Sequence, residues 1–368
     1  MLKHEVVSIT PAIIDIACDL TNREQVYLKL CALLESGPGQ WKSVDDKKVI
    51  EELLGVVAGI VTFNLNDDFD SLGLTPGVRI EAGSTGLNLL SALSKPQREN
   101  SAMVSAVGSD SSGNPDSLAN YFAKDAAKVG IYQYSIPHEG CTPLVLVFSH
   151  KDEPDKVTAM HPGVAAQVES VPRSVEKSKI VHIDAYDLTR EPAFTTLDRL
   201  IGSGRVPIAL GLGNSSILQG KLREIILRYI ATKKITYLMG NSEEFGLLLN
   251  SNPIRTLEQA TSLNAGQLAP YVLVTLGKDG LIGFEKNKPV FQRPFLQKNP
   301  VNTSGAGDTA AGIFLSGILS GQEFPLTLKE SAYYSSQIVG SLSSRFTSDR
   351  EKLYKDEHAD AGDQLDNE

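Results

Sequence analysis

Residues 206–241 read VPIALGLGNSSILQGKLREIILRYIATKKITYLMGN, and this stretch decides the fold. Its ends, 206–213 and 235–241, are short apolar runs, and a helical pattern fills 217–232 between them. Apolar runs of this length are typical of strands buried on both faces, and parallel strands need a helical crossover between them. The stretch therefore predicts a strand–helix–strand unit of a parallel sheet.

The same alternation continues on both sides of this unit. KIVHIDAYD at 179–187 precedes a helical pattern at 193–202, and YVLVTLG at 271–277 is a further apolar run. LIGFEK and PVFQRPF, separated by NK, then predict a hairpin. Together these segments predict an α/β fold with a mostly parallel sheet that helices cover on both faces.

The first part of the chain is less regular. EVVSITPAIIDIACDL predicts one starting strand, and AMVSAVGSD predicts another strand, followed by a helix around 116–129. Residues 21–80 show neither period, whereas TPLVLVFSH and KVTAMHP predict a hairpin outside the parallel core. We expect one domain over 1–350, with a small discontinuous β lid supplied by about 20–80 and 135–165.

Composition and charge narrow the class of protein. The 368 residues are 41% hydrophobic and include no apolar run of about 18 residues, so we expect no transmembrane helix. The N-terminus offers no convincing signal-peptide cleavage site. Cys18, Cys31 and Cys141 are too scattered for a zinc site or a disulfide frame, which favours reduced thiols in the cytoplasm.

The net charge of −9 is concentrated in the last residues. Residues 351–368 hold seven acidic residues against two lysines, which leaves −5 for this segment. The segment is polar and unpatterned, so we expect a disordered acidic tail. The rest of the chain has no basic stripe, and we expect neither a nucleic acid nor a membrane as partner.

One further stretch carries the chemistry. Residues 301–315 read VNTSGAGDTAAGIFL, in which Gly305, Ala306 and Gly307 open a helical pattern. A turn of small residues at a helix start exposes backbone N–H groups to an anion. Asp308 either removes a proton from a hydroxyl group beside that anion or caps the helix. From this stretch alone both interpretations stay open.

Polar residues also follow the predicted parallel strands. Ligands bind at the carboxyl ends of the strands in such sheets, and these ends meet at one edge. The edge would bring together Asp308 and residues that are far apart in sequence, namely Asp184, Tyr186, Gly213, Asn214, Asn241, Glu244, Thr275 and Gly277. This convergence predicts a binding site at that edge.

Each of these motifs has a structural alternative. Asn241 and Glu244 could organise Mg²⁺ through water, or they could cap a helix. Thr275, Gly277 and Gly280 could let a ligand approach the backbone, or they could form a plain hairpin turn.

The N-terminal part offers a second group of binding residues. Gly83, Gly86 and Asn88 suit a polyol held against bare backbone, or they form a glycine-rich helix start. Asp15 lies inside an apolar strand, where it either pairs with another side chain or binds a ligand such as a sugar diol.

Several enzyme classes lack their motifs. The six histidines show no metal-ligand spacing, and there is no GxxxxGK[ST] phosphate loop. GLGNSS at 211–216 lacks the third glycine of a dinucleotide fingerprint, which argues against hydride transfer.

Taken together, the motifs resemble those of the PfkB, or ribokinase-like, family of sugar and nucleoside kinases, over most of residues 5–345. NTSGAGD resembles the DTxGAGD signature of that family, and NSEE resembles its NxxE motif. GSTGLN resembles the GGxxxN stretch, VGSDSSG resembles GxDxxG, and VTLGKDG resembles the strand and turn along the nucleotide site. Five such elements in the order of the family are far more specific than any one of them.

The resemblance implies a Rossmann-like doubly wound sheet with a lid, and ATP- and Mg²⁺-dependent phosphorylation of a hydroxymethyl group. It implies that Asp308 is the general base and that the amides of Gly305, Ala306 and Gly307 form an anion hole. The resemblance also implies that Asn241 and Glu244 organise Mg²⁺ through water. It implies that Thr275, Gly277 and Gly280 lie against ATP. The hydroxyl groups of the acceptor would be held by Asp15, Gly83 and Asn88.

Within the family, the insertion at 20–80 resembles that of adenosine kinases and inosine-guanosine kinases. This resemblance implies the 5′-hydroxyl of a nucleoside such as adenosine as acceptor, and a role in purine salvage. A fructose- or ribose-like sugar is the alternative acceptor, and a non-catalytic nucleoside- or nucleotide-binding protein is the alternative class. The chain departs from the family pattern at Asn302, Ser84 and Lys156. Either a monomer or a homodimer is compatible with the sequence.

Overall fold

The computed structural model describes residues 4–35, 41–66, 68–150, 153–298, 300, 303–341 and 343–346. Within them the chain forms two sheets, and the larger one has nine strands in the order β14-β13-β12-β11-β10-β9-β1-β5-β6. The strands from β6 to β12 in this order run parallel, and β13 and β14 continue the sheet antiparallel. Their bounds are Val6–Ile9 (β1), Ala102–Ser109 (β5), Tyr132–Glu139 (β6), Ile180–Asp184 (β9), Ile208–Gly211 (β10), Tyr237–Asn241 (β11), Tyr271–Thr275 (β12), Leu281–Glu285 (β13) and Lys288–Gln292 (β14).

The smaller sheet has five strands in the order β3-β8-β7-β2-β4 within the described residues. Its strands come from distant parts of the chain: Ile14–Asp19 (β2), Trp41–Ser43 (β3), Val78–Ala82 (β4), Leu144–His150 (β7) and Glu153–His161 (β8). The predicted hairpin outside the parallel core is present, because β7 and β8 pair antiparallel. The α/β fold with a large, mostly parallel sheet and a small second sheet is therefore confirmed.

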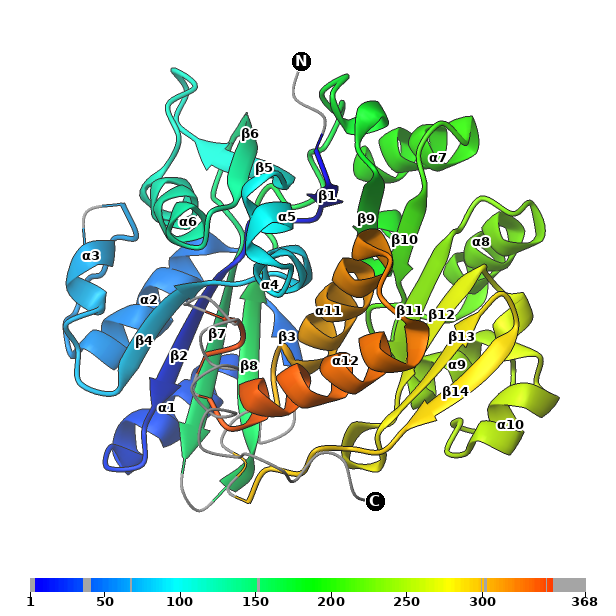
Figure 1. Cartoon of the computed structure of the whole chain (residues 1–368). Coiled ribbons are helices and arrows are strands. Elements are labelled where there is room, and N and C mark those ends of the chain that lie inside the picture. Colours follow the sequence, from blue (N-terminus) through cyan, green and yellow to red (C-terminus); the bar gives the residue numbers. More distant parts are fainter. Residues whose placement is uncertain are drawn as a thin grey trace.

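Helices surround both sheets. Their bounds are Glu24–Leu34 (α1), Lys47–Ala58 (α2), Phe69–Leu72 (α3), Thr85–Ser91 (α4), Lys95–Glu99 (α5), Ser117–Lys128 (α6), Ala193–Ser203 (α7), Gly220–Ala231 (α8), Ser242–Leu248 (α9), Leu257–Ser262 (α10), Ala306–Ser320 (α11) and Phe324–Val339 (α12). Short 3₁₀ turns lie at Val175–Lys177 (η1), Ala185–Leu188 (η2), Ala265–Gln267 (η3) and Gly277–Asp279 (η4). Figure 1 shows α11 and α12 between the small sheet and the β10–β13 half of the large one.

The inner strands β1, β5 and β9 of the large sheet are buried on both faces, which explains their unbroken apolar runs. Val6 belongs to the hydrophobic cluster on one face, and its neighbour Val7 belongs to the cluster on the other. Helices α7, α8 and α9 contribute to the cluster around Val7, whereas α4, α11 and α12 contribute to the cluster around Val6. Adjacent side chains of one strand are thus both apolar because each faces a covered layer.

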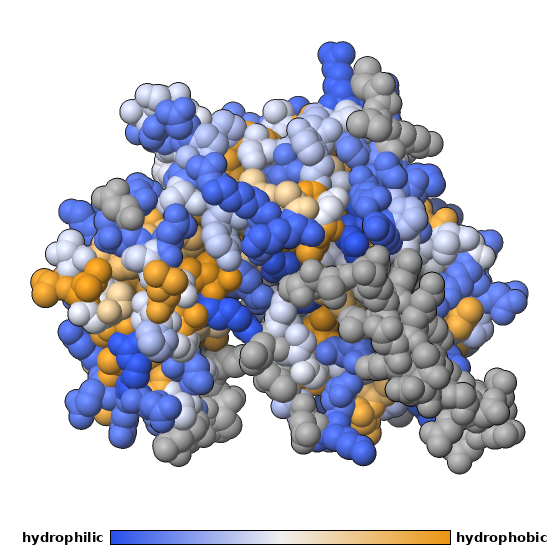
Figure 2. Space-filling model, turned by 60° about the vertical axis from the view of Figure 1, so that its left-hand side comes forward, coloured by the Kyte–Doolittle hydropathy of each residue, from blue (hydrophilic) through white to orange (hydrophobic). Residues whose placement is uncertain are grey.

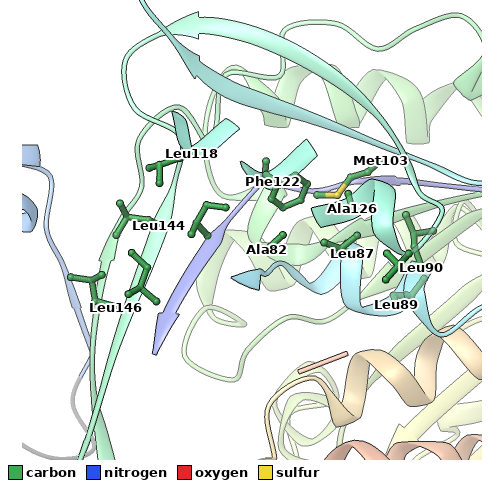
Figure 3. Close-up of a cluster of buried hydrophobic side chains, with 14 of the residues drawn as sticks. Ala82, Leu87, Leu89, Leu90, Met103, Leu118, Phe122, Ala126, Leu144 and Leu146 are labelled. Atoms are coloured by element: carbon green, nitrogen blue, oxygen red, sulfur yellow. The ribbon is translucent and has the colours of Figure 1, made fainter. Parts of the chain in front are cut away.

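The cluster around Val6 also joins the two sheets. Figure 3 shows Ala82 of β4, Met103 of β5 and Leu144 of β7 among its side chains, with Phe122 of α6 between them. These side chains are fully buried. The small sheet is therefore anchored to the large one through a continuous apolar layer.

Two parts of the predicted fold are wrong. The single starting strand is two strands: β1 lies in the large sheet and β2 in the small sheet, with Pro11 between them. Proline lacks a backbone donor and restricts the residue before it, so the ladder of one sheet ends there. In addition, residues 135–139 of the expected lid segment belong to β6, at the edge of the large sheet.

The expected irregular region is a third error, because it contains α1, α2 and α3. Helix α1 has no side-chain cap and carries exposed Leu28, so its sequence lacks both a clear start and a clear polar face. Val61 and Leu74, which follow α2 and α3, are exposed as well. Figure 2, with this side turned forward, shows hydrophobic residues gathered on it.

Two other expectations concern the ends and the membrane. The acidic tail at 351–368 lies outside the described residues. In the part of the chain that the structure describes, no helix has the length and apolar character needed to span a bilayer.

Candidate active site

Helix α11 begins at a glycine turn that opens toward a cavity. Gly305 is the N-cap residue with φ of +77°, and a Cβ there would collide with the Ser344 carbonyl oxygen. At Gly307 a Cβ would meet nothing within 4 Å, so this backbone is open to a ligand. Ala306 N–H donates a long bond of 3.4 Å to the Thr303 carbonyl oxygen. The start of α11 therefore has the backbone exposure that an anion site requires.

Asp308 does not cap this helix. The N-cap is Gly305, and α11 has no side-chain capping hydrogen bond. Asn88 Nδ2 instead donates to Asp308 Oδ2 at 3.0 Å, and burial raises the pKa of Asp308 to about 6. The capping interpretation is thus wrong, and Asp308 faces the cavity from the first turn of the helix.

The cavity has a volume of about 600 Å³ and gathers residues from the ends of successive strands. Its wall includes all the residues predicted to hold phosphate and nucleotide: Asn241, Glu244, Thr275, Gly277, Gly280, Gly305, Ala306, Gly307 and Asp308. A second group of lining residues is apolar: Leu281, Phe295, Leu296, Ala332 and Val339. Polar groups at the start of α11 and apolar side chains elsewhere on the same wall suit a ligand that has a charged part and a flat apolar part.

Asn241 and Glu244 have the capping role that the sequence offered as one of two alternatives, and their role toward Mg²⁺ stays a prediction. They form a capping box for α9: Asn241 Oδ1 accepts from Glu244 N at 2.9 Å, and Glu244 Oε2 accepts from Asn241 N at 2.8 Å. Both residues also line the cavity. Burial, with a smaller contribution from the charge of Asp308, raises the pKa of Glu244 to about 6. The cap fixes the carboxylate at the cavity wall.

Asp184 is a third carboxylate on this wall, at the end of β9. Burial raises its pKa to about 7, and the charges of Asp308 and Glu244 contribute to the increase. Its Oδ1 accepts from Tyr186 N at 3.0 Å, and a Cβ on Gly213 would meet that oxygen at 2.7 Å. The sequence placed Asp184 and Gly213 on the rim but assigned neither of them a role.

This set of carboxylates fits Mg²⁺ held largely by water. No group of three or more ligating side chains is close enough to enclose a metal in the described ranges. Mg²⁺ usually keeps several waters and is bound by one or two carboxylates together with phosphate oxygens. Glu244 and Asp184 both line the cavity, so the residues present are compatible with such a water-held ion.

The two glycines after β12 differ in what the structure requires of them. One is needed for the hairpin turn, and the other leaves its backbone open. Gly280 has φ of +105°, and a Cβ there would collide with the Gln292 carbonyl oxygen, so the hairpin itself requires this glycine. Gly277 has φ of +61°, and a Cβ there would meet nothing within 4 Å, which leaves its backbone open to the cavity. Thr275 Oγ1 donates to the Gly240 carbonyl oxygen at 3.5 Å.

The residues predicted to hold the acceptor lie on the other side of Asp308. A Cβ on Gly83 would collide with the Asp15 carboxylate, so only glycine leaves room for this side chain. Burial raises the pKa of Asp15 to about 7, with smaller contributions from the charges of Glu81 and Asp308. Asn88 connects this group to Asp308 through its hydrogen bond. Asp15, Gly83 and Asn88 are therefore brought together beside the end of the cavity.

A segment near the end of the described chain completes this network, and nothing in the sequence hinted at it. Ser344 Oγ donates to Asn88 Oδ1 at 3.4 Å and lies 3.3 Å from Glu81 Oε1. Arg345, 3% exposed, donates to the Asp125 carboxylate and to the Ala82 carbonyl oxygen. These contacts join residues more than 200 positions apart, and no local motif marks a serine or an arginine for such a role.

The three departures from the family pattern have different outcomes. Ser84 adopts φ of +90° at the N-cap of α4, and its Oγ accepts from Leu87 N at 3.2 Å. Asn302 lies outside the described residues. Lys156 lies in β8, and its side chain is outside what the structure describes.

Comparisons with known proteins agree with this geometry. A family model described as pfkB family carbohydrate kinase matches residues 54–351. A 5-dehydro-2-deoxygluconokinase from Geobacillus kaustophilus is 27% identical over 156 residues, which cover 42% of this chain and 47% of that protein. A 5-dehydro-2-deoxygluconokinase from Listeria monocytogenes is 23% identical over 175 residues, which cover 46% of this chain and 53% of that protein. The chain thus spans about half the length of the curated relatives it matches.

Solved structures share the fold over nearly the whole chain. A probable sugar kinase from Rhizobium etli superposes with a TM-score of 0.74 at 15% identity, covering 97% of this chain and 99% of that chain. An adenosine kinase from Sinorhizobium meliloti gives 0.72 at 18% identity, covering 96% and 99%. At such identities the likeness establishes the fold, and the family model covers most of the sequence. The chain belongs to the PfkB family of carbohydrate kinases.

Proposed function

We propose that the protein is an ATP-dependent kinase that phosphorylates a hydroxymethyl group of a small polyhydroxylated acceptor. One observation carries the proposal: Asn88 holds Asp308 on the first turn of α11, beside the open backbone of Gly307 and at the end of the cavity. A base next to an anion site is the arrangement that phosphoryl transfer to an alcohol requires. The family assignment supports the same reaction.

The chemistry assigns a distinct role to each side of Asp308. Its carboxylate takes the proton of the acceptor hydroxyl, whose oxygen then forms a bond to the γ-phosphorus of ATP. The bond from that phosphorus to the bridging oxygen breaks, and ADP leaves. The amides of Gly305 and Gly307 stabilise the charge on the transferring group, with Ala306 at the same turn. ATP extends along the cavity past Thr275, Gly277 and Gly280 toward its apolar end.

A bound Mg²⁺ would neutralise charge on the β- and γ-phosphates. Glu244 would hold it through water, with Asn241 fixing the orientation of that carboxylate. Asp184 lines the same cavity and would supply a second carboxylate for the ion.

A sugar is the acceptor that the comparisons favour. The curated relatives are named as kinases of a gluconate derivative, although each match covers only about half of the chain. Asp15 and Asn88 offer a carboxylate and an amide to ring hydroxyls, as a sugar requires. These findings support the sugar alternative better than the nucleoside predicted from the motifs.

A nucleoside is the second candidate acceptor. The insertion between β2 and β4 favours it, because α1 to α3 give the small sheet the long extension that resembles nucleoside kinases. A role in purine salvage depends on this candidate and stays a prediction. A non-catalytic binding protein is disfavoured, because Asp308 and the glycine turn keep their catalytic arrangement.

The test is an acceptor screen with purified protein, ATP and Mg²⁺, followed by ADP release and by the mass of the product. Rapid phosphorylation of a free sugar would support the leading acceptor, and phosphorylation of nucleosides alone would support the second candidate. ATP-independent binding without turnover of any acceptor would contradict the kinase proposal.

A further inference from the structure

The acceptor side of Asp308 is surrounded by negative charge. Asp15 of β2 and Glu81 of β4 are directly opposite each other in the antiparallel pair, so their side chains lie on the same face of the small sheet. Asp308, on the first turn of α11, is connected to this group by hydrogen bonds: Asn88 donates to Asp308, and Ser344 Oγ lies 3.4 Å from Asn88 Oδ1 and 3.3 Å from Glu81 Oε1. Carboxylates from three separate elements therefore lie in one network around the proposed base.

The nearest cations already have partners. Arg345 is buried and bonds to the Asp125 carboxylate and to the Ala82 carbonyl oxygen, so its charge is shared between Asp125, which it contacts, and Asp15, whose pKa it lowers without offsetting the effect of burial. Arg79 is partly exposed and lies 3.9 Å from Glu81. Within the described residues, the arginines around this group are thus committed to acids of the protein.

Neutral groups fix Glu81 in place. Ser343 Oγ donates to Glu81 Oε2 at 2.9 Å, and the backbone N–H of Ser344 donates to Glu81 Oε1 at 3.3 Å. The side chain is partly buried, with 13% exposure. Hydroxyl and amide donors hold this carboxylate, and the long, partly exposed contact with Arg79 offsets only part of its charge, so a second anion beside it would be repelled.

We propose that the acceptor is a neutral polyol, and that Glu81 is the residue that discriminates against acceptors bearing a carboxylate or a phosphate. The inference rests on the proposed kinase function and makes its substrate class more specific. Neutral hydroxyl groups are ideal donors to Asp15 and Glu81, whereas an anionic acceptor would have to enter beside both. The chain would thereby differ from kinases of sugar acids while keeping the same reaction.

The experiment compares neutral and anionic acceptors on the full chain. The neutral set is D-ribose, D-fructose, D-glucose and adenosine, and the anionic set is D-gluconate, 2-keto-D-gluconate and fructose 6-phosphate. Initial rates of ADP release give kcat/KM for each acceptor, and mass spectrometry identifies the product. We expect the best neutral acceptor to exceed the best anionic one by about 10²-fold or more, as repulsion by two nearby carboxylates predicts.

Glu81→Gln tests the discrimination itself. Glutamine keeps an oxygen for the Ser344 N–H and removes the charge, so we expect kcat/KM for the anionic set to rise by about tenfold relative to the neutral set, mainly through KM. Glu176→Gln is the matched control, because it removes the same charge from an exposed ion pair with Arg205. Thermal unfolding of each variant confirms that it is folded, and binding of gluconate without ATP gives a second readout.

Each outcome bears on a different claim. Preference for neutral acceptors that Glu81→Gln reduces, and Glu176→Gln leaves intact, supports the inference. If the wild type prefers an anionic acceptor, the inference is overturned and the proposed function still stands. The same conclusion follows if Glu81→Gln shows the same preference between neutral and anionic acceptors as Glu176→Gln. Absence of turnover with every acceptor overturns the proposed function, and the inference with it.

Discussion

Asp308 and its partner Asn88 show how a single hydrogen bond defines a candidate catalytic residue. The bond holds the carboxylate away from the helix end that it would otherwise cap, and it directs one oxygen toward the acceptor side. In the proposed reaction, the other oxygen, Oδ1, accepts the proton of the substrate hydroxyl. This division of the two oxygens makes the basicity of Asp308 directly testable.

The first prediction concerns the base itself. Asp308→Asn keeps the shape of the side chain and removes its basicity, so kcat should fall by about 10²–10⁴-fold while KM for ATP changes little. Steady-state ADP release measures both constants. Circular dichroism and thermal unfolding should show a folded variant, and near-normal turnover would rule out Asp308 as the base.

The second prediction is a pH dependence. The base must be deprotonated, and burial raises the pKa of Asp308 to about 6, so kcat/KM should fall as the pH drops below about 6. Asp184, whose pKa is raised to about 7, is coupled to Asp308, and the acidic limb will therefore report the group as a whole. A pH–rate profile that spans both sides of this value tests the prediction, and a flat profile would contradict it.

At the residue level, the sequence could point to candidate residues only where they form a local motif. Asp308 and the glycine turn are adjacent in the chain, so the sequence exposed them together. Glu81 and Ser344 interact across 263 positions, and their residue types are common on any surface. No pattern could mark them, because their role arises only when the two sheets and α11 have packed together.

At the scale of elements, the start of α11 contains two glycines with opposite requirements. Gly305 is required for folding for two reasons. A Cβ there would collide with the Ser344 carbonyl oxygen, and any other residue would be strained by the left-handed φ of +77°. Gly307 has open space around it and is already helical. Gly305→Ala should lower the free energy of unfolding by about 2–4 kcal/mol through overpacking and backbone strain.

Gly307→Ala should instead raise the free energy of unfolding. Alanine is the better helix former by about 0.5–1 kcal/mol, but its methyl group would occupy the phosphate position and lower kcat/KM by about 10²-fold. Urea unfolding and steady-state kinetics on both variants separate the two effects. Equal losses of stability at the two positions would contradict this assignment.

The start of α4 offers another prediction, because Ser84 has φ of +90°. Ser84→Gly loses the bond to Leu87 N but relieves the backbone strain, so the free energy of unfolding should rise by about 0.5–1 kcal/mol. Ser84→Ala keeps the strain and loses the cap, and should lower the same free energy by about 1 kcal/mol. Urea denaturation of the pair gives the sign of each change.

Helices and strands could be predicted from the sequence where their burial produces a simple hydrophobic pattern. The strands of the large sheet are covered on both faces, so β9 to β12 appear in the sequence as unbroken apolar runs. Helices α1 and α2 are covered on one side only, and exposed Leu28 blurs the period that would have revealed α1. The change from β1 to β2 has no hydrophobic signal, because both strands are buried, and only Pro11 marks it.

At the scale of the whole molecule, the carboxylates of the site act together on stability. Burial raises the pKa of Asp15 and Asp184 to about 7, and that of Glu244 to about 6. The folded state therefore binds more protons than the unfolded state between about pH 4 and 7, and the free energy of unfolding should decrease as the pH rises through this window. Buried His182, with its pKa lowered to about 4, opposes this trend over part of the range.

The resulting prediction is that the midpoint of thermal unfolding falls as the pH rises from about 5 to about 8. Asp184→Asn removes one buried charge and should flatten the dependence and raise the midpoint at the alkaline end. Differential scanning calorimetry across the range measures both. A midpoint that increases steadily with pH in the wild type would show that other groups dominate.

The contact between Ser344 and Gly305 also bears on how the protein is made. Asp15, Glu81 and Asn88 emerge from the ribosome early, Asp308 emerges late, and Ser344 and Arg345 emerge later still. The carboxylates of the site cannot be locked into their final arrangement until translation has passed Arg345. A nascent chain that already contains both sheets would thus lack this arrangement until α12 had been followed by the short segment around Ser344 and Arg345.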